Sequence, residues 1–284
     1  MSSIPKSFVL GAKGYLGQAL HGAVKRVYPE SMGLTRNSVP LEDPDLSIVG
    51  VEDMGYEWGI IAAAVPGLAH CEANPGETRA CNVDGTLALA RQMAAIGIRP
   101  VWFSSDQVFD GTAGPYTDET LTSPVNEYGR QKAEVEARFA EASSGTGLVI
   151  RLSKVYDCFP GSGTLLDAML TNLGAGNTER AASDLIFCPT LLGDVVACTL
   201  RLMTSGASGI ANVAAGPVSR LALATMAAEV AGVDASSVQP MRMADLNEPF
   251  ARPGPVELVP SPRLGEYKFQ DVRASLEHLV RARA

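Results

Sequence analysis

The sequence contains few of the residues that build disulfide frameworks and metal centres. Among 284 residues there are five cysteines and three histidines. The cysteines are odd in number, scattered and without a CxxC spacing, and no histidines stand at the spacing of paired metal ligands. We therefore expect neither a disulfide framework nor a structural metal, and we interpret the thiols as small buried side chains.

Long apolar runs and clusters of basic residues are also lacking. No apolar run approaches the roughly 20 residues of a membrane-spanning helix, and residues 1–14 lead into an expected strand without the apolar core of a signal peptide. The net charge of -8 and the pI near 5.0 disfavour nucleic acid and anionic membrane surfaces as partners. These absences indicate a cytoplasmic protein that acts on neither of them.

What is present is an ordinary globular composition, with 46% hydrophobic and 19% charged residues. In the first half, strand-like apolar runs alternate with helical segments, which is typical of an α/β fold with a doubly wound parallel sheet of the Rossmann type. The expected strands are 7–12, 31–36, 58–65, 100–105 and 147–153, with a weakly patterned one at 45–50, and the expected helices are 15–28, 77–97 and 126–142.

After Val155 the alternation becomes irregular. Proline and glycine gather in residues 247–265, which predicts a loop that runs over the surface or across a cleft. The remaining patterns predict helices at 161–176, 191–204 and 269–284 and strands at 183–187 and 209–215.

A glycine-rich loop, GAKGYLGQ, separates the first expected strand from its helix. Gly11, Gly14 and Gly17 would allow a tight turn, the approach of a pyrophosphate to backbone N–H groups, and close packing of the helix on the strand. Such a loop can also simply turn the chain, but its place between a strand and a helix favours a dinucleotide site. The other cofactor contacts that we expect nearby are Tyr15, Leu16, Ala62 and Ala63.

The second expected strand ends in an arginine, where a protein that selects NAD(H) would be expected to carry Asp or Glu. The guanidinium of Arg36 can stack on an adenine and pair with a ribose 2′-phosphate. The alternative explanation is a surface arginine at a strand end. Arg36 therefore favours NADP(H) over NAD(H) as the cofactor.

Tyr128 and Lys132 stand four residues apart on the expected helix 126–142, and so on one face of it. An ammonium group one turn away would lower the pKa of the phenol and could also hold the cofactor ribose, which would make Tyr128 a proton donor. In isolation, such a pair is more often part of a solvated helix face.

The combination of these features carries more information than each alone. With the glycine-rich loop, a hydroxyl at the end of a later strand (Ser105) and the Tyr128–Lys132 pair, the chain resembles the extended branch of the short-chain dehydrogenase/reductase superfamily. Within that branch it is similar to the dTDP-4-dehydrorhamnose reductase family. The resemblance covers most of residues 8–215 and also rests on ANPGETRACNVDGTLALA, FSSDQVFDGTAGPYTDETLTSPVNEYGRQKAEVE, VIRLSKVYD and CPTLLGDVV.

The resemblance implies an NADP(H)-dependent reductase whose substrate is a nucleotide-activated keto-sugar. In that family's arrangement Ser105 polarises the substrate carbonyl, Tyr128 protonates its oxygen, and Lys132 supports the tyrosine. It further implies an NADP-binding domain at 1–155, to which residues of about 183–215 return, and a region at 156–284 that mostly binds substrate. The residues expected to contact the substrate are Ser105, Asp106, Gln107 and Lys154.

At two positions the chain departs from these reductases. Gln107 stands where they usually have Tyr and where the related dehydratases have a Glu that removes an α-proton. An amide cannot act as that base, which argues against dehydration. Lys154 stands where Trp is common. A lysine that faces the sugar would suit a substrate with a carboxylate or more hydroxyls, whereas one that turns outward would leave the pocket open.

Several alternatives remain open at this stage. The chain could be a sugar-nucleotide epimerase, which keeps its cofactor bound and shows no net redox change, or a catalytically silent NADP-binding regulatory subunit of the type found beside methionine adenosyltransferase. A homodimer is also expected. Asn82 either steadies the active-site backbone or bonds its own helix, and Cys188 either lines the substrate cleft or packs in the core.

Overall fold

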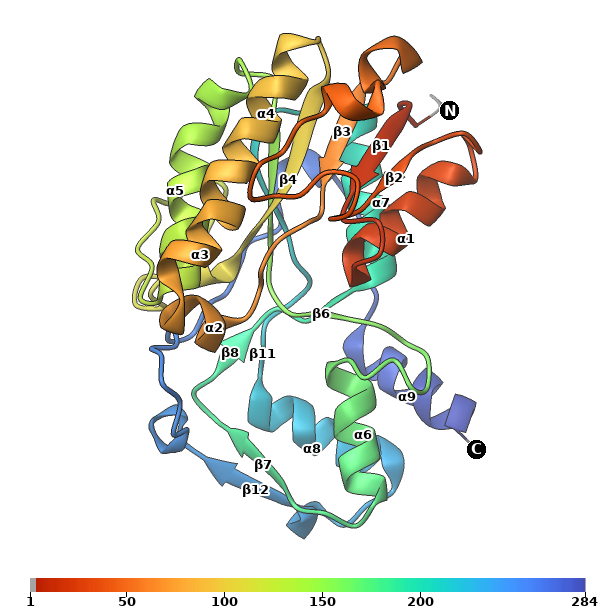
Figure 1. Ribbon diagram of the computed structural model, residues 1–284. Helices are drawn as coiled ribbons and strands as arrows, with labels where there is room; N and C mark the ends of the chain where they lie inside the picture. The colour runs from red at the N-terminus through yellow and green to blue at the C-terminus, as the bar shows by residue number, and fades with distance from the viewer. Residues whose placement is uncertain (1–3, 284) are drawn as a thin grey trace.

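The centre of the protein is a six-stranded parallel sheet, seen in the upper part of Figure 1. The computed structural model describes residues 4–283, so that the start of the N-terminal segment and the end of the expected last helix lie outside the described residues. The strands, in spatial order, are β10 (Gly209–Val213), β5 (Leu148–Leu152), β4 (Arg99–Ser105), β3 (Trp58–Ile61), β1 (Ser7–Leu10) and β2 (Gly33–Leu34). This sheet confirms the expected doubly wound Rossmann-type fold.

Helices cover both faces of this sheet. Leu87 and Phe139, from two helices on one face, belong to one apolar cluster, and Leu20 and Val195, from two helices on the other face, belong to a second cluster. The helices of the first face are α4 (Thr86–Ala95) and α5 (Glu127–Ala142), and those of the second are α1 (Tyr15–Lys25) and α7 (Leu192–Thr204). Strands β1 and β3 are buried along their whole length because both of their faces are covered.

The weakly patterned strand at 45–50 is not formed, which corrects that expectation. The segment instead makes two 3₁₀ turns, Ser47–Val49 and Val51–Met54. Gly50 and Gly55 end these turns with positive φ angles of 63° and 68°, a backbone conformation that interrupts a strand. Val51 still packs into the core. In the sheet, β1 lies between β2 and β3. The chain goes from β1 outward to β2 and then crosses back to form β3 on the other side of β1, so the sheet changes its winding direction between β1 and β3.

The expected helix at 77–97 is broken into several pieces. It is preceded by α2 (Leu68–Ala73) and begins as α3 (Pro75–Arg79), continues as a π-helical turn over Ala80–Gly85, and becomes α4. A Cβ atom on Gly85 would lie 1.7 Å from the backbone oxygen of Leu41. The wide turn and the glycine thus let segment 35–46 cross closely over this helix.

A smaller group of elements lies below the sheet in Figure 1. Its apolar cluster includes Leu166, Leu223 and Leu276 from three helices. The expected strand at 183–187 shrinks to two residues, which pair with β11. The elements here are α6 (Leu165–Gly174), β7 (Glu179–Ala182), β8 (Ile186–Phe187), β11 (Val218–Ser219), α8 (Arg220–Ala231), β12 (Val238–Met241) and α9 (Val272–Arg283), and β6 (Val155–Tyr156) pairs with β9 (Thr190–Leu191) on the way down from the sheet.

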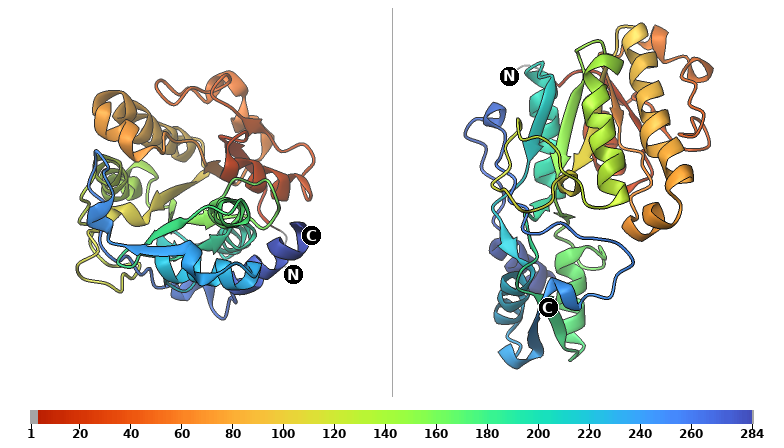
Figure 2. Two further views of the ribbon diagram at one scale, coloured as in Figure 1. Left: turned by 90° about the horizontal axis from the view of Figure 1, so that it is seen from below. Right: turned by 90° about the vertical axis from the view of Figure 1, so that its left-hand side faces the viewer.

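After β12 the chain returns to the sheet along the left-hand side of Figure 1, and the second view in Figure 2 shows this loop standing out from the molecule. Residues 246–257 have no regular secondary structure, as the proline and glycine content predicts. Within residues 4–283, no helix is long and apolar enough to cross a membrane, and no group of three or more His, Cys, Asp or Glu side chains could hold a metal ion.

Candidate active site

The glycine-rich loop and the end of β3 enclose a cavity of about 440 Å³ at the carboxyl edge of the sheet. Gly11 has a φ angle of 82°, and a Cβ atom on it would lie 2.7 Å from the backbone nitrogen of Ala63. A Cβ on Gly17 would lie 2.2 Å from the oxygen of Gly11. Both glycines are therefore required by close backbone contacts, and the place of the cavity between β1 and β3 is where doubly wound sheets bind nucleotides.

The cavity gathers five of the residues expected at the cofactor. Tyr15 instead lines the larger cavity described below, and Leu16 packs against the apolar cluster under α1. Lys13, inside the GAKG loop, was not singled out from the sequence but also lines the cavity. The expected residues that line it are Gly11, Gly14, Arg36, Ala62 and Ala63.

Arg36 lies at the rim of this cavity with 70% of its side chain exposed. Its Nη2 atom donates to Glu42 Oε1 at 3.0 Å. An exposed ion pair of this kind is weak and exchanges readily with other partners. The guanidinium is therefore free to turn toward an anion in the cavity.

A second cavity, of about 590 Å³, lies between the sheet and the lower elements. The expected catalytic residues come from two elements that meet at its wall. Ser105 is the last residue of β4, and Tyr128 lies in the first turn of α5. The side chain of Asn126 caps α5 by accepting from the Gly129 N–H at 2.8 Å, which sets where the helix begins. Asp106, Gln107 and Lys154 line the same cavity.

Lys132 is buried behind Tyr128, with 3% of the residue exposed. Its Nζ donates to the Phe103 carbonyl at 2.8 Å and lies 4.4 Å from the Trp102 ring centroid and 5.5 Å from that of Tyr128. Burial lowers the pKa of Lys132 to about 7. The ammonium is thus held by one carbonyl and two aromatic faces instead of a carboxylate.

The expectation that Lys132 lowers the pKa of the Tyr128 phenol is wrong for this structure. Burial raises that pKa above its usual value, and the neighbouring Cys71 and the Asp106 carboxylate raise it further. Desolvation outweighs the lysine because Lys132 is itself desolvated. Tyr128 is accordingly held in its protonated form.

Asp106 joins the hydroxyl groups at this wall. Its Oδ1 accepts from Ser105 Oγ at 3.1 Å, and its Oδ2 accepts from Ser153 Oγ at 2.6 Å. Gln107 Nε2 also donates to Oδ1, at 3.2 Å. Sequence reasoning missed Ser153, although its place at the end of a predicted strand was a usable signal. The carboxylate orients Ser105 at the cavity surface.

The two ambiguous residues have clear places in the structure. Asn82 accepts from the Val65 N–H at 2.8 Å and donates to the Val65 oxygen at 3.0 Å, so it holds the loop after β3 and not its own helix. Cys188 is fully buried in an apolar cluster with Phe109 and Val256, and it is a core thiol. All five cysteines lie within the described residues and are free thiols.

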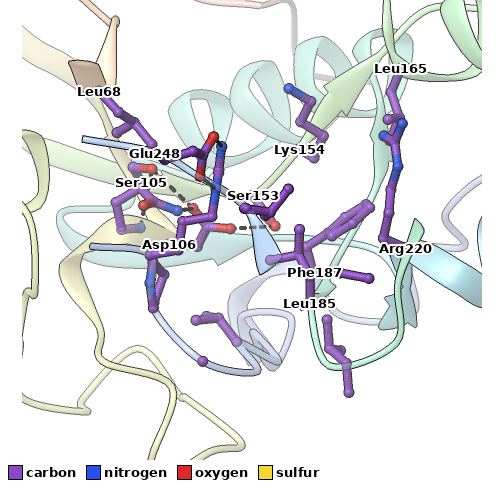
Figure 3. A pocket seen from close by; sticks show the side chains of 18 of the residues that line it. Leu68, Ser105, Asp106, Ser153, Lys154, Leu165, Leu185, Phe187, Arg220 and Glu248 are labelled. Atoms are coloured by element: carbon purple, nitrogen blue, oxygen red, sulfur yellow. Dashed lines mark hydrogen bonds and ion pairs between the residues drawn. The ribbon is translucent and has the colours of Figure 1, made fainter. Parts of the chain in front are cut away.

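Basic side chains line the larger cavity as well. Arg220 pairs with Glu179 at 2.7 Å, and Arg252 forms a bidentate pair with Glu248. Within residues 4–283, Lys154 has no carboxylate at ion-pair distance. Burial and the charge of Arg220 lower the pKa of Lys154. Figure 3 shows Lys154 between Ser153 and Arg220. The basic residues of the cavity are Lys154, Arg180, Arg220 and Arg252.

No sequence signal pointed to these three arginines, because they come from the irregular second half of the chain. Arg180 lies on β7 and Arg220 begins α8, both below the sheet, while Arg252 lies in the loop after β12. Only the packing of the lower elements against the sheet brings them to one cavity.

Comparisons with known proteins agree with this geometry. A family model described as the RmlD substrate binding domain matches residues 6–282. The chain is 31% identical over 261 residues to dTDP-4-dehydrorhamnose reductase of Mycobacterium tuberculosis, covering 87% of this chain and 81% of that protein. It is 40% identical over 165 residues to methionine adenosyltransferase 2 subunit beta of Rattus norvegicus, covering 54% of this chain and 48% of that one.

Among solved structures, dTDP-4-dehydrorhamnose reductase of Bacillus anthracis in complex with NADP superposes with a TM-score of 0.84 at 20% identity, over 98% of this chain and 99% of that one. This likeness extends through both the sheet and the lower elements. The chain therefore belongs to the RmlD substrate-binding-domain family, within the extended short-chain dehydrogenase/reductases.

Proposed function

We propose that this protein is an NADP(H)-dependent reductase of a nucleotide-activated keto-sugar, similar to dTDP-4-dehydrorhamnose reductase. The observation that carries the proposal is the meeting of Ser105 and Tyr128 at one cavity wall, with Lys132 directly behind the phenol. Family membership and the reductase named among the relatives support it. We further propose that residues 1–155, with about 183–215, hold the cofactor and that 156–284 holds most of the substrate.

The cofactor cavity fits a dinucleotide. Backbone atoms fill the space beside Gly11 and Gly17 so closely that no side chain could be added there, and the loop leads directly into the N-terminal turn of α1, where backbone N–H groups suit a pyrophosphate. When bound, NADPH supplies the hydride for the carbonyl carbon. Gly11, Gly14, Ala62 and Ala63 would hold it, and Arg36 would turn from Glu42 to its 2′-phosphate.

The chain's own residues would handle the substrate oxygen. The single proton of the Ser105 hydroxyl is donated to Asp106 in the free protein and would turn to the substrate carbonyl, which it then polarises. Tyr128 gives its proton to the oxygen as negative charge develops there, and its raised pKa keeps it protonated beforehand. Lys132 then stabilises the tyrosinate by its charge. The proton thus passes from the Tyr128 phenol to the alkoxide oxygen, and the phenolate that remains lies beside Lys132.

The basic wall of the cavity suits the diphosphate of a nucleotide sugar. We propose that Lys154 in addition faces the sugar and adapts the pocket to a substrate with a carboxylate or more hydroxyls than a 4-keto-6-deoxy sugar. Its support is that Lys154 lines the cavity and that Arg220 and Arg252 raise the positive potential around it. An unpaired cation in such a place is stabilised when an anion binds.

The direct test is a panel of nucleotide-4-keto-sugars screened for NADPH oxidation. Tyr128→Phe removes one oxygen and keeps the ring, so cofactor binding should survive while kcat falls roughly 10²–10⁴-fold. Unchanged turnover in this variant would remove Tyr128 from the mechanism. An epimerase would convert its sugar without net NADPH oxidation.

The similarity to methionine adenosyltransferase 2 subunit beta keeps a second function in view, that of a cofactor-binding regulatory subunit. Such a subunit would bind NADPH but would not oxidise it, whichever sugar of the panel is added. A cytoplasmic homodimer is also part of our proposal, and sedimentation equilibrium of the purified protein tests the dimer.

A further inference from the structure

One irregular segment of the chain lines the larger cavity. We call residues 246–256 the strap. It leaves β12 below the sheet and rises toward the loops after β4, along the left of Figure 1. Six of its residues line the cavity, among them the Glu248–Arg252 ion pair. The strap has no regular secondary structure, so its position must be set by contacts with other segments.

The C-terminal end of the strap is fixed by backbone contacts. The Gly254 N–H donates to the Asp110 oxygen at 2.8 Å, and the Val256 N–H donates to the Ile186 oxygen at 3.1 Å. Gly111 has a φ angle of 78°, and a Cβ on it would lie 2.3 Å from the carbonyl carbon of Gly254. The two backbones thus cross in direct contact.

The middle of the strap is held by one side chain. Asn126, with 1% of the residue exposed, donates through Nδ2 to the Ala251 oxygen at 3.1 Å and to Gln107 Oε1 at 3.0 Å. Its Oδ1 accepts the Gly129 N–H that caps α5. One buried amide therefore joins the strap, the loop after Ser105 and the helix that carries Tyr128.

The groups at the ends of this network determine which atom donates in each of its hydrogen bonds. The Ala251 carbonyl and the Asp106 carboxylate can only accept, and the Gly129 N–H can only donate. Turning the Asn126 amide over would place its oxygen against Ala251 and its NH₂ against the Gly129 N–H. Turning Gln107 over would place its oxygen against Asp106. The network therefore has a single satisfied arrangement.

We propose that Asn126 is a positioning residue that holds the strap at the substrate cavity. It fixes the position of the strap relative to α5 and Gln107. Gln107 then acts as the link between Asn126 and Asp106. The strap brings Arg252 and Glu248 to the cavity, so its position determines where the charged groups meet a bound ligand. The effect expected on substrate binding rests on the proposed function, whereas the placement of the strap does not.

Hydrogen exchange of single amides, followed by NMR on the full chain without ligands, tests the placement. Asn126→Ser keeps a capping oxygen and removes both donors, and Asn126→Asp keeps the cap but places negative oxygen against the Ala251 carbonyl. In both variants the amides of Gly254 and Val256 should exchange about tenfold faster, while Gly129 stays protected. The matched control is Asp271→Asn, since Asp271 accepts the Ala274 N–H at 2.9 Å at the start of α9.

Unchanged exchange at Gly254 and Val256 in both variants would show that the backbone crossing alone holds the strap, and the proposal would be wrong. Faster exchange throughout the chain, α9 included, would make Asn126 a general structural residue and would equally overturn it. In Asn126→Ser the KM for the nucleotide sugar should rise about fivefold with the KM for NADPH unchanged. A wild-type protein without reductase activity would refute the proposed function and leave the exchange result standing.

Discussion

At the scale of single residues, the cofactor preference depends on one exposed guanidinium. Arg36 and Glu42 form a solvent-exposed ion pair, and pairs of this kind contribute little to stability. Exchanging Glu42 for a phosphate dianion would strengthen the contact because the charge is larger and bidentate geometry is available.

Arg36→Asp should therefore weaken NADPH binding by about 1–3 kcal/mol and leave NADH binding nearly unchanged. Fluorescence titration of both cofactors measures the two affinities, and Arg36→Lys serves as the control that keeps the charge. If the wild-type protein binds NADH more tightly than NADPH, the assignment of Arg36 fails.

Lys154 is the residue at which substrate preference can be tested. Lys154→Trp replaces the cation by a flat apolar surface and should raise kcat/KM for dTDP-4-dehydrorhamnose relative to sugars with a carboxylate, by about tenfold. Lys154→Met separates loss of charge from gain of an aromatic surface. An identical ranking of substrates in wild type and both variants would show that Lys154 does not select the sugar.

At the scale of elements, the broken helix of residues 75–95 shows how a local irregularity permits a close crossing. The π-helical turn over Ala80–Gly85 brings a glycine under segment 35–46, where the Leu41 carbonyl occupies the place of a side chain. The chain between β2 and β3 then packs against the helix without forming a strand of its own.

Gly85→Ala should destabilise the protein by on the order of 2–4 kcal/mol, because a backbone segment must move to admit the methyl group. Gly76→Ala is the matched control, since Gly76 is helical and a Cβ atom added to it would meet no other atom within 4 Å. It should be neutral or stabilising by about 0.5–1 kcal/mol. Urea unfolding of both variants measures the difference, and equal stabilities would contradict the crossing.

At the scale of the whole molecule, the buried charge of Lys132 makes stability depend on pH. Its pKa is about 7 in the folded protein against 10.5 for the free side chain. Between these values the unfolded chain binds more protons than the folded one, so the free energy of unfolding contributed by Lys132 rises with pH.

Lys132→Met removes this titration. From pH 7 to pH 9 the wild type should gain on the order of 1–2 kcal/mol of stability relative to Lys132→Met. Comparing the two proteins cancels the titration of the buried thiols, which they share. A difference in the free energy of unfolding that stays constant over this range would show that Lys132 titrates near its usual pKa.

The amino-acid sequence by itself determined the parallel sheet. It also determined the order along the chain of the loops that carry the expected cofactor and catalytic residues. The strongly apolar runs became the buried strands, and Gly17 is demanded by a backbone contact with Gly11 inside one strand–turn–helix unit. Ser105 stands at a strand end, and the helix period puts Tyr128 and Lys132 on one face, so local patterns gave their placement, whereas their roles came from the family resemblance.

Only the tertiary structure decided the rest. The basic wall of the cavity joins Lys154, Arg180 and Arg252, which are far apart in the chain and lie on elements without a common pattern. Burial is a property of the packed molecule, and it reversed the expected direction of the Tyr128 pKa. Long-range hydrogen bonds, such as that of Asn126 to Ala251, depend on where a loop without periodicity comes to rest, and no local sequence signal encodes that position.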